Sequence, residues 1–194
     1  WGYTDIVNWN DSQFSSLKEA LKYFVDYAGM DETGETQVGP MAGGLVFFAA
    51  SNEGYYQGDV KKYPAADANV VAVASIAADY RPAYYTNYGT WVDISAPGGD
   101  PFFSDLENPY VGVGYGSSTA EVLSTFVNGY GHMSGTSMAC PHASGVAALG
   151  LSYANQLGIA MTAETLKKYI YETARDIDSY LKDDDYKYLP LQDG

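Results

Sequence analysis

The sequence has 194 residues, which fits one ordinary domain or part of a larger one rather than two independent domains. Hydrophobic residues make up 46% of the chain and charged residues 18%, so it has enough apolar material for a packed core. The net charge of −14 repels phosphate backbones and excludes nucleic acid as a partner. No apolar run approaches the ~18 to 20 residues that a membrane span needs, and a single Cys140 allows no internal disulfide.

Apolar residues spaced three and four apart predict a surface helix between Asp11 and Gly29. They are Phe14, Leu17, Leu21, Phe24 and Ala28. Ser16 and Glu19 match the spacing of a capping box at the start of this helix. Residues 30–41, rich in glycine, threonine and acidic residues, are expected to form a surface loop.

Three apolar runs predict strands that are covered on both faces, as in a parallel sheet. The first run is Leu45–Ala50, the second is Val70–Ile76, and the third is the short Trp91–Ile94, which a Pro-Gly-Gly turn would close. Residues 100–130 show a poor pattern, in which we expect long excursions and one hairpin around 111–115.

Two helices are predicted in the last third of the chain. The residues that follow Ser137 are apolar around almost the whole helical circumference, so this helix is expected to be buried on every side. A final helix is predicted from Thr162, a candidate N-cap, to Ala174. The order of elements predicts an α/β layered fold with a mostly parallel sheet and a buried central helix. Because three strands are too few to cover that helix, missing parts of a parent protein or another copy of the chain would have to cover it.

The stretch with the strongest chemical signal runs from Gly131 to His142. A serine at a helix N-terminus lies beside unsatisfied N–H groups and the positive end of the helix dipole, where a developing oxyanion is stabilised. Ser137 is therefore a candidate nucleophile. An isolated serine at a helix start is more often only a cap, and spacing alone does not decide between the two interpretations.

Four stretches, in chain order, resemble the subtilisin-like serine peptidases, the subtilases. Residues 135–142, Gly-Thr-Ser-Met-Ala-Cys-Pro-His, resemble the nucleophile segment of that family, and residues 49–54, Ala-Ala-Ser-Asn-Glu-Gly, resemble its oxyanion segment. Residues 63–74 resemble its Tyr-Pro-Ala turn and the strand after it, and residues 91–98 also fit. The resemblance implies that residues 1–194 are the C-terminal part of a single subtilase catalytic domain and that the substrate is a polypeptide.

Carried over residue by residue, the family pattern makes Ser137 the nucleophile and Asn52 the side-chain donor that binds the oxyanion together with the Ser137 N–H. An Asn at a strand end is more often a turn residue, so the role depends on the motif around it. An amide can donate without titrating. Loss of such a donor typically lowers turnover roughly 10²- to 10³-fold, a magnitude that comes from subtilisin, itself a subtilase. The implied reaction is endopeptidase hydrolysis through an acyl-enzyme on Ser137.

The resemblance also implies substrate-binding residues around the acyl group. Ala49, Ala50 and Ser51 would line this pocket. Ser51 stands where the family usually has glycine, which puts the shape of the pocket in question. Trp1 and Gly2 resemble the end of a pocket-lining Ser-Trp-Gly or Ser-Leu-Gly segment, with an ordinary strand end as the alternative.

The base that would activate the serine is missing from the matched region. A nucleophilic serine needs an adjacent histidine, itself oriented by an aspartate. His142 lies more than one turn beyond Ser137 on the same helix, and the family makes it structural. His132 is expected to pack in a polar loop. The family's Asp-Ser/Thr-Gly and His-Gly-Thr segments do not occur in the sequence, so we expect an excised part, inactive alone, whose partner is the N-terminal part of the domain.

Other functions and ligands follow less directly. A catalytically dead peptide-binding or scaffold module stays open because the base is missing. An α/β-hydrolase esterase and penicillin-binding-type chemistry are excluded, because Ala139 breaks Gly-x-Ser-x-Gly and Cys140 stands where the second requires lysine. No metal site is expected: residues 183–185, three aspartates, fit a solvated helix end, although the resemblance makes calcium possible in the parent. The family also implies a secreted or envelope location, and the uncovered helix predicts an oligomer for the isolated chain.

Overall fold

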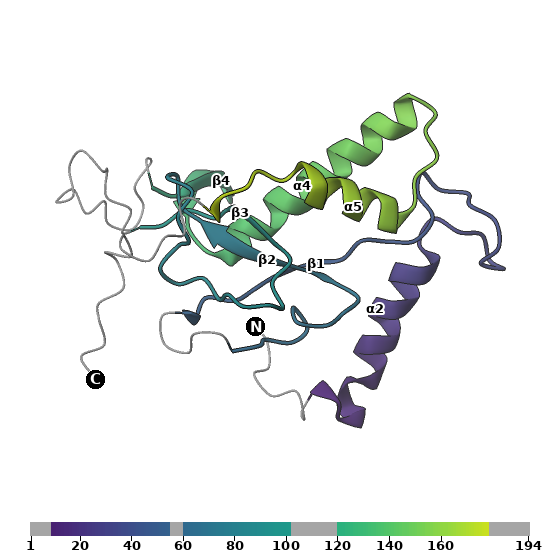
Figure 1. Cartoon of the computed structure of the whole chain (residues 1–194), viewed down its shortest axis with the longest axis horizontal. Coiled ribbons are helices and arrows are strands. Elements are labelled where there is room, and N and C mark those ends of the chain that lie inside the picture. Colours follow the sequence, from purple (N-terminus) through teal and green to yellow (C-terminus); the bar gives the residue numbers. More distant parts are fainter. Residues whose placement is uncertain (1–8, 55–59, 102–119, 179–194) are drawn as a thin grey trace.

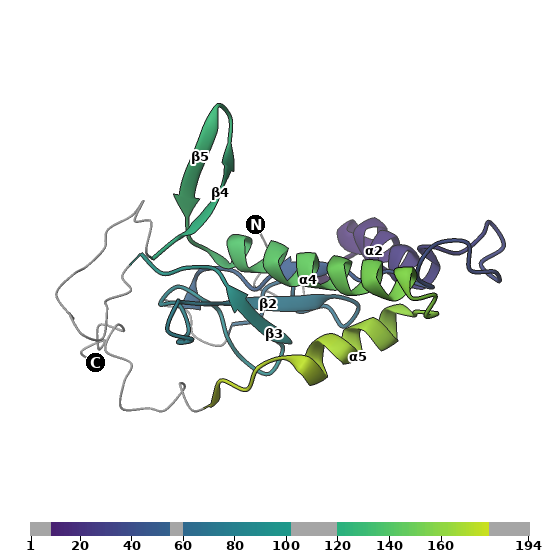
Figure 2. The same ribbon diagram turned by 90° about the horizontal axis from the view of Figure 1, so that it is seen from above.

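The computed structural model describes residues 9–54, 60–101 and 120–178. Over these ranges, helices pack on a parallel sheet and a separate antiparallel hairpin leaves the body of the molecule (Figures 1 and 2). The elements are η1 (Ser12–Phe14), α2 (Ser15–Tyr27), β1 (Phe47–Ala49), β2 (Val71–Ile76), β3 (Ile94–Pro97), β4 (Val122–Phe126), β5 (Gly129–Met133), α4 (Thr136–Gln156) and α5 (Ala163–Thr173). The predicted α/β class with a parallel sheet is confirmed.

The sheet has the order β1-β2-β3, with both pairs parallel. Phe47 lies opposite Val71, and Val73 lies opposite Ile94. Every residue of β2 is buried, as its uninterrupted apolar run predicts. Because the strands are parallel, the turns that follow them gather at one edge of the sheet, where ligands bind in open α/β folds.

The third strand begins three residues later than the sequence indicates. It spans Ile94–Pro97 rather than Trp91–Ile94, because Trp91 instead packs into a buried alanine cluster beside β2. Pro97 is the last residue of the strand and pairs with Ile76. In the described sheet β3 is an edge strand, where a residue without an N–H is tolerated.

The first helix is confirmed, but it does not begin with the predicted capping box. Phe14 occupies the N-cap position of α2 and makes no side-chain cap bond. The 3₁₀ turn η1 starts the helix instead, with the Phe14 N–H donating to the Asp11 carbonyl at 3.0 Å. The helix ends before Gly29, whose φ of 74° is a left-handed conformation that glycine adopts without strain.

Helix α4 covers one face of the sheet, and α5 lies alongside it (Figure 2). The small residues Ala139 and Ala143 of α4 pack against β2 and β3, which lets α4 approach the sheet closely. On its outer side, Val146 is 60% exposed, Leu149 72% and Tyr153 65%. The prediction that this helix is buried on every side is therefore wrong for the described chain, since the helix is covered only where it faces the sheet and α5. Thr162 caps α5 as predicted, accepting from the Thr165 N–H at 3.1 Å.

Strands β4 and β5 form an antiparallel hairpin that projects from the body (Figure 2). Val122 pairs with Met133, and Phe126 pairs with Gly129. The hairpin falls where the sequence predicted only irregular chain, whereas the hairpin predicted around 111–115 lies outside the described residues. Among the described helices, none is both long and apolar enough to cross a membrane.

Candidate active site

Asn52 lies in the turn that follows β1, at the carboxyl edge of the sheet. The chain leaves β1 through Ala50, whose N–H donates to the Val73 carbonyl at 2.9 Å. Ser51 then takes a φ of 85°, which is left-handed and turns the backbone sharply. Asn52 itself is exposed, so its carboxamide is free to meet groups from other segments.

Ser137 is the second residue of α4, a helix that begins directly after Gly135. The Gly135 N–H donates to the Gly98 carbonyl at 3.0 Å, which ties the start of the helix to the end of β3. A Cβ on Gly98 would lie 2.6 Å from the Gly135 carbonyl oxygen and 2.1 Å from the Ser75 Oγ. Only glycine fits at position 98, and the close approach fixes where α4 begins. Ser137 is exposed at that point.

The two segments meet through the side chain of Asn52. Its Oδ1 accepts hydrogen bonds from the Thr136 N–H at 2.9 Å and from the Thr136 Oγ1 at 2.8 Å. Thr136 is buried, with 1% of its surface exposed. Since Oδ1 is fully used, the Nδ2 group remains as a donor for another partner.

Two amide donors flank the same point beside Gly135. A Cβ placed on Gly135 would lie 3.5 Å from the Asn52 Nδ2 and 3.6 Å from the Ser137 backbone nitrogen. None of the backbone hydrogen bonds within the described residues uses the Ser137 N–H, as is usual in the first turn of a helix. A pair of converging donors next to a helix-borne hydroxyl is an arrangement that can bind the oxygen of a tetrahedral intermediate.

The remaining predicted substrate-binding residues have different surroundings. Ala49 is the last residue of β1 and is half-buried, as is Ser51. Ala50 has no exposed surface and packs against Ala65, Ala72 and Trp91. In this structure its side chain therefore belongs to the core beneath the turn and does not line an open pocket. Trp1 and Gly2 lie outside the described residues.

Within the described residues, neither histidine hydrogen-bonds to Ser137. The Nδ1 of His142 hydrogen-bonds the Met138 carbonyl of its own helix at 2.8 Å. His132 lies on β5 opposite Leu123, and its buried Nδ1 has no partner among the described residues. No group of three or more His, Cys, Asp or Glu side chains that could hold a metal occurs in the described part of the chain. The acidic residues 183–185 lie outside that part.

Cys140 is half-buried and packs against the cluster between α4 and the sheet. Burial raises the pKa of its thiol, which keeps the group protonated at neutral pH. A thiol that stays protonated is a poor nucleophile and a poor metal ligand, so Cys140 serves here as a small apolar packing residue.

Residues 85–87, which no sequence pattern indicated as part of the site, connect β2, the end of β3 and the turn after β1. The Tyr85 hydroxyl donates to the Gly98 and Gly99 carbonyls after β3 and hydrogen-bonds the Ser75 Oγ in β2 at 2.8 Å. Burial raises the pKa of Tyr85, so its hydroxyl keeps the proton that these carbonyls accept. The next residues, Thr86 and Asn87, bond to β2 and to the turn after β1. No periodicity or known motif marks this segment in the sequence.

The fold and the site together define an α/β protein in which a serine in the first turn of a helix lies beside the carboxamide of Asn52. The model of the subtilase family matches residues 4–189. The chain therefore belongs to the subtilase family, the subtilisin-like serine peptidases, and the predicted resemblance is confirmed.

The relatives of the chain are proteases of several kinds. It is 34% identical over 131 residues to the extracellular basic protease of Dichelobacter nodosus, an alignment that covers 68% of this chain and 19% of that protein. It is 38% identical to the major intracellular serine protease of Bacillus subtilis, covering 57% of this chain and 29% of that protein. It also matches the crystal structure of a lanthipeptide protease with a TM-score of 0.59 and 25% identity, covering 87% of this chain and 51% of that chain.

The matched proteins are much longer than this chain. The chain spans from 16% to 29% of the length of the curated relatives compared. It spans 44% of the solved chain of the prenylagaramide maturation protease PagA, which it matches with a TM-score of 0.53 and 26% identity over 72% of its own length. The described fold corresponds to part of the larger protease fold.

Proposed function

We propose that the protein containing this chain is a serine endopeptidase and that Ser137 is its nucleophile. In the proposed reaction, the Ser137 hydroxyl adds to the scissile carbonyl, and a histidine supplied from outside residues 1–194 takes its proton. The same histidine returns the proton to the leaving amine as the peptide C–N bond breaks, and water then hydrolyses the acyl-enzyme. Asn52 and the Ser137 N–H stabilise the oxyanion in both steps.

The observation that carries the proposal is the coupling of Asn52 to the start of α4. Thr136 holds Oδ1 of Asn52, which turns Nδ2 toward Gly135, beside the unbonded Ser137 N–H. A serine that served only as a helix cap would not need this second donor. The geometry thus supports acyl transfer more than a purely structural role for the motif.

We also propose that residues 1–194 are the C-terminal part of one catalytic domain and are inactive alone. The basis is the absence of the family's Asp and His segments from the sequence. Without a base and its orienting carboxylate, only residual effects of the oxyanion donors and of binding would remain.

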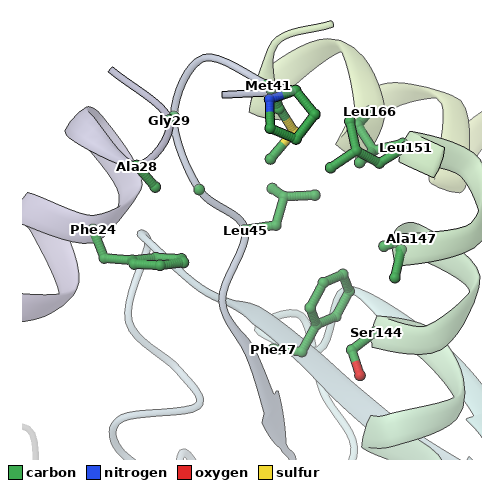
Figure 3. Close-up of a pocket in the computed structure, with 14 residues that line it drawn as sticks. Phe24, Ala28, Gly29, Met41, Leu45, Phe47, Ser144, Ala147, Leu151 and Leu166 are labelled. Carbon is green, nitrogen blue, oxygen red and sulfur yellow. The ribbon is translucent and has the colours of Figure 1, made fainter. Parts of the chain in front are cut away.

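The proposed partner of the chain is the N-terminal part of the same domain, and two apolar surfaces support this. One is the exposed outer side of α4, with Val146, Leu149 and Tyr153. The other is a groove of about 290 Å³ between α2 and α4. Figure 3 shows Phe24 on one side of this groove and Ala147 and Leu151 on the other. Surfaces of this kind on a soluble protein mark contacts with other segments.

A fluorophosphonate probe tests the proposal, because it reacts only with an activated serine. In the full-length protein we expect labelling that is lost in Ser137→Ala and kept in Ser134→Ala, a neighbouring serine that bonds Glu121 instead. Residues 1–194 alone should not be labelled. A folded full-length protein that stays unlabelled would instead favour a catalytically dead peptide-binding or scaffold module, the second candidate function, which the missing base supports.

The location and cofactor of the full-length protein remain proposals as well. Two relatives are named extracellular proteases, whereas one is named intracellular, and we propose a secreted or envelope location. Calcium in the parent protein is proposed from the family resemblance alone.

A further inference from the structure

Asn87 lies at the centre of a buried hydrogen-bond cluster behind the turn that holds Asn52. It has no exposed surface. Its N–H donates to the Ser51 carbonyl at 3.1 Å, and its Oδ1 accepts from the Glu53 N–H at 2.8 Å. Its Nδ2 donates to the Val60 carbonyl at 3.3 Å. A buried amide costs free energy unless it is hydrogen-bonded, and here the backbone N–H, the Oδ1 and one hydrogen of the Nδ2 group each have a partner.

The two bonds to the turn bracket Asn52. One holds the carbonyl immediately before Asn52, and the other holds the N–H immediately after it. Ser51 also has a left-handed φ of 85°, a conformation that persists in a residue other than glycine only when its surroundings hold it. Asn87→Ala would keep the backbone bond to Ser51 but would remove the acceptor of the Glu53 N–H. The peptide that follows Asn52 would then be free to rotate, and the strained Ser51 before it could relax.

The side chain of Asn52 is therefore fixed at two ends. Thr136 holds the Oδ1 at its tip, and Asn87 holds the backbone at its base. We propose that Asn87 is a positioning residue that aims the Nδ2 donor of Asn52 at the oxyanion without touching the substrate. The inference deepens the function proposed above and rests on it.

The kinetic test uses the full-length protein with Asn87→Ala, Asn52→Ala and the double variant. We expect Asn87→Ala to lower kcat roughly 10- to 100-fold with little change in KM. A catalytic group that is misplaced by about 1 Å lowers the rate by this order of magnitude. Because Asn87 acts through Asn52, the double variant should be no slower than Asn52→Ala. A double variant whose losses multiply would overturn the proposal.

Asp93→Ala provides a matched control for lost stability. The Asp93 Oδ2 accepts the Ala72 N–H at 2.8 Å, the same kind of bond as the one from Glu53 to Asn87, but at the amino end of the strands. This variant should lose stability while keeping kcat. If Asp93→Ala and Asn87→Ala lower kcat equally, Asn87 has only a structural role.

A second measurement does not depend on activity. Hydrogen exchange followed by mass spectrometry reports the N–H of Thr136, which bonds Asn52. Peptides covering residues 51–54 and 135–139 should exchange faster in Asn87→Ala than in the wild-type protein. In Asp93→Ala their exchange rates should be unchanged. If the wild-type protein has no peptidase activity but this exchange pattern appears, the proposed function fails while the positioning role stands. Unchanged exchange in Asn87→Ala would overturn the positioning role whatever the activity.

Discussion

The two ends of one carboxamide, that of Asn52, have different tasks. The oxygen is held by Thr136 at 2.8 and 2.9 Å, which leaves the NH₂ group as a donor of fixed direction. An aspartate at this position could accept from Thr136, but it could not donate, and in the proposed reaction it would present a negative charge to the developing oxyanion. Asparagine suits this position because its short side chain carries both an acceptor for Thr136 and a donor.

A second residue with a well-defined environment is Asp31, in the loop after α2. Hydrogen bonds, first from the Thr33 hydroxyl and then from the Thr36 and Glu35 N–H groups, lower the pKa of its carboxyl to about 2. A carboxylate with a depressed pKa stabilises the fold above its unfolded pKa of about 3.9, and this contribution is lost as the pH falls from there through about 2. We expect NMR titration to give a pKa of about 2, rising toward the ordinary value in Thr33→Val. Thr125→Val, on the distant hairpin, should leave the titration unchanged, and an unaltered pKa in Thr33→Val would show that the hydroxyl is not the main cause.

The sequence predicts site roles for Ser137 and Asn52 only through the motifs around them. The bond between Thr136 and Asn52 and the bond between Asn87 and Glu53 could not be predicted, because they join residues 84 and 34 positions apart. Local patterns carry no information on such contacts, which depend on how the strands are ordered in the sheet. The sequence therefore predicted the residues at the tip of the site but not those that hold them.

Among the elements, the long apolar runs were predicted most reliably. The run that became β2 is buried at every position, so its pattern and its environment agree. The hairpin of β4 and β5 was missed, although Asn128-Gly129 lies at its turn and Asn-Gly between hydrophobic residues is a strong hairpin signal. Its many glycines and its position outside the core hid the alternation, because neither face of the hairpin needs to be consistently apolar.

The contact between the end of β3 and the start of α4 makes a testable prediction about glycine. In residues 1–194, Gly98→Ala should lower the free energy of unfolding by about 1 to 3 kcal/mol, because the added methyl group would collide with the Gly135 carbonyl oxygen and Ser75. Gly145→Ala is the control, since a Cβ there meets nothing within 4 Å and the position lies inside α4. Alanine should stabilise that site by up to about 1 kcal/mol. Urea unfolding measures both, and a Gly98→Ala protein as stable as wild type would disprove the close contact.

At the scale of the whole molecule, α4 has the sequence of a helix from a larger fold. Its composition predicts neighbours on all sides, whereas the described chain covers only the sides that face the sheet and α5. A pattern reports the environment in which a helix is stable, but it cannot say which chain segment provides that environment. This is why the burial of α4 was predicted wrongly for these residues while the need for a further partner was inferred from the same pattern.

The exposed side of α4 predicts self-association of residues 1–194 when the proposed partner is absent. Burying Val146, Leu149 and Tyr153 against a second copy is favoured by the hydrophobic effect, whereas the net charge of −14 opposes it. Salt screens the repulsion, so light scattering should give masses above 21.0 kDa that rise with ionic strength.

The residues responsible for this association can be separated from other exposed apolar residues by two triple variants. Replacing Val146, Leu149 and Tyr153 by serine should return the chain to a monomer, because the apolar surface of α4 is then lost. Replacing Leu123, Val127 and Tyr130, exposed on the hairpin, should leave the larger species in place, because the hairpin projects away from α4 (Figure 2). A wild-type chain that remains a compact, stable monomer of 21.0 kDa at every ionic strength would show that α4 tolerates an uncovered side. If only the hairpin variant became monomeric, the association would have to be assigned to the hairpin.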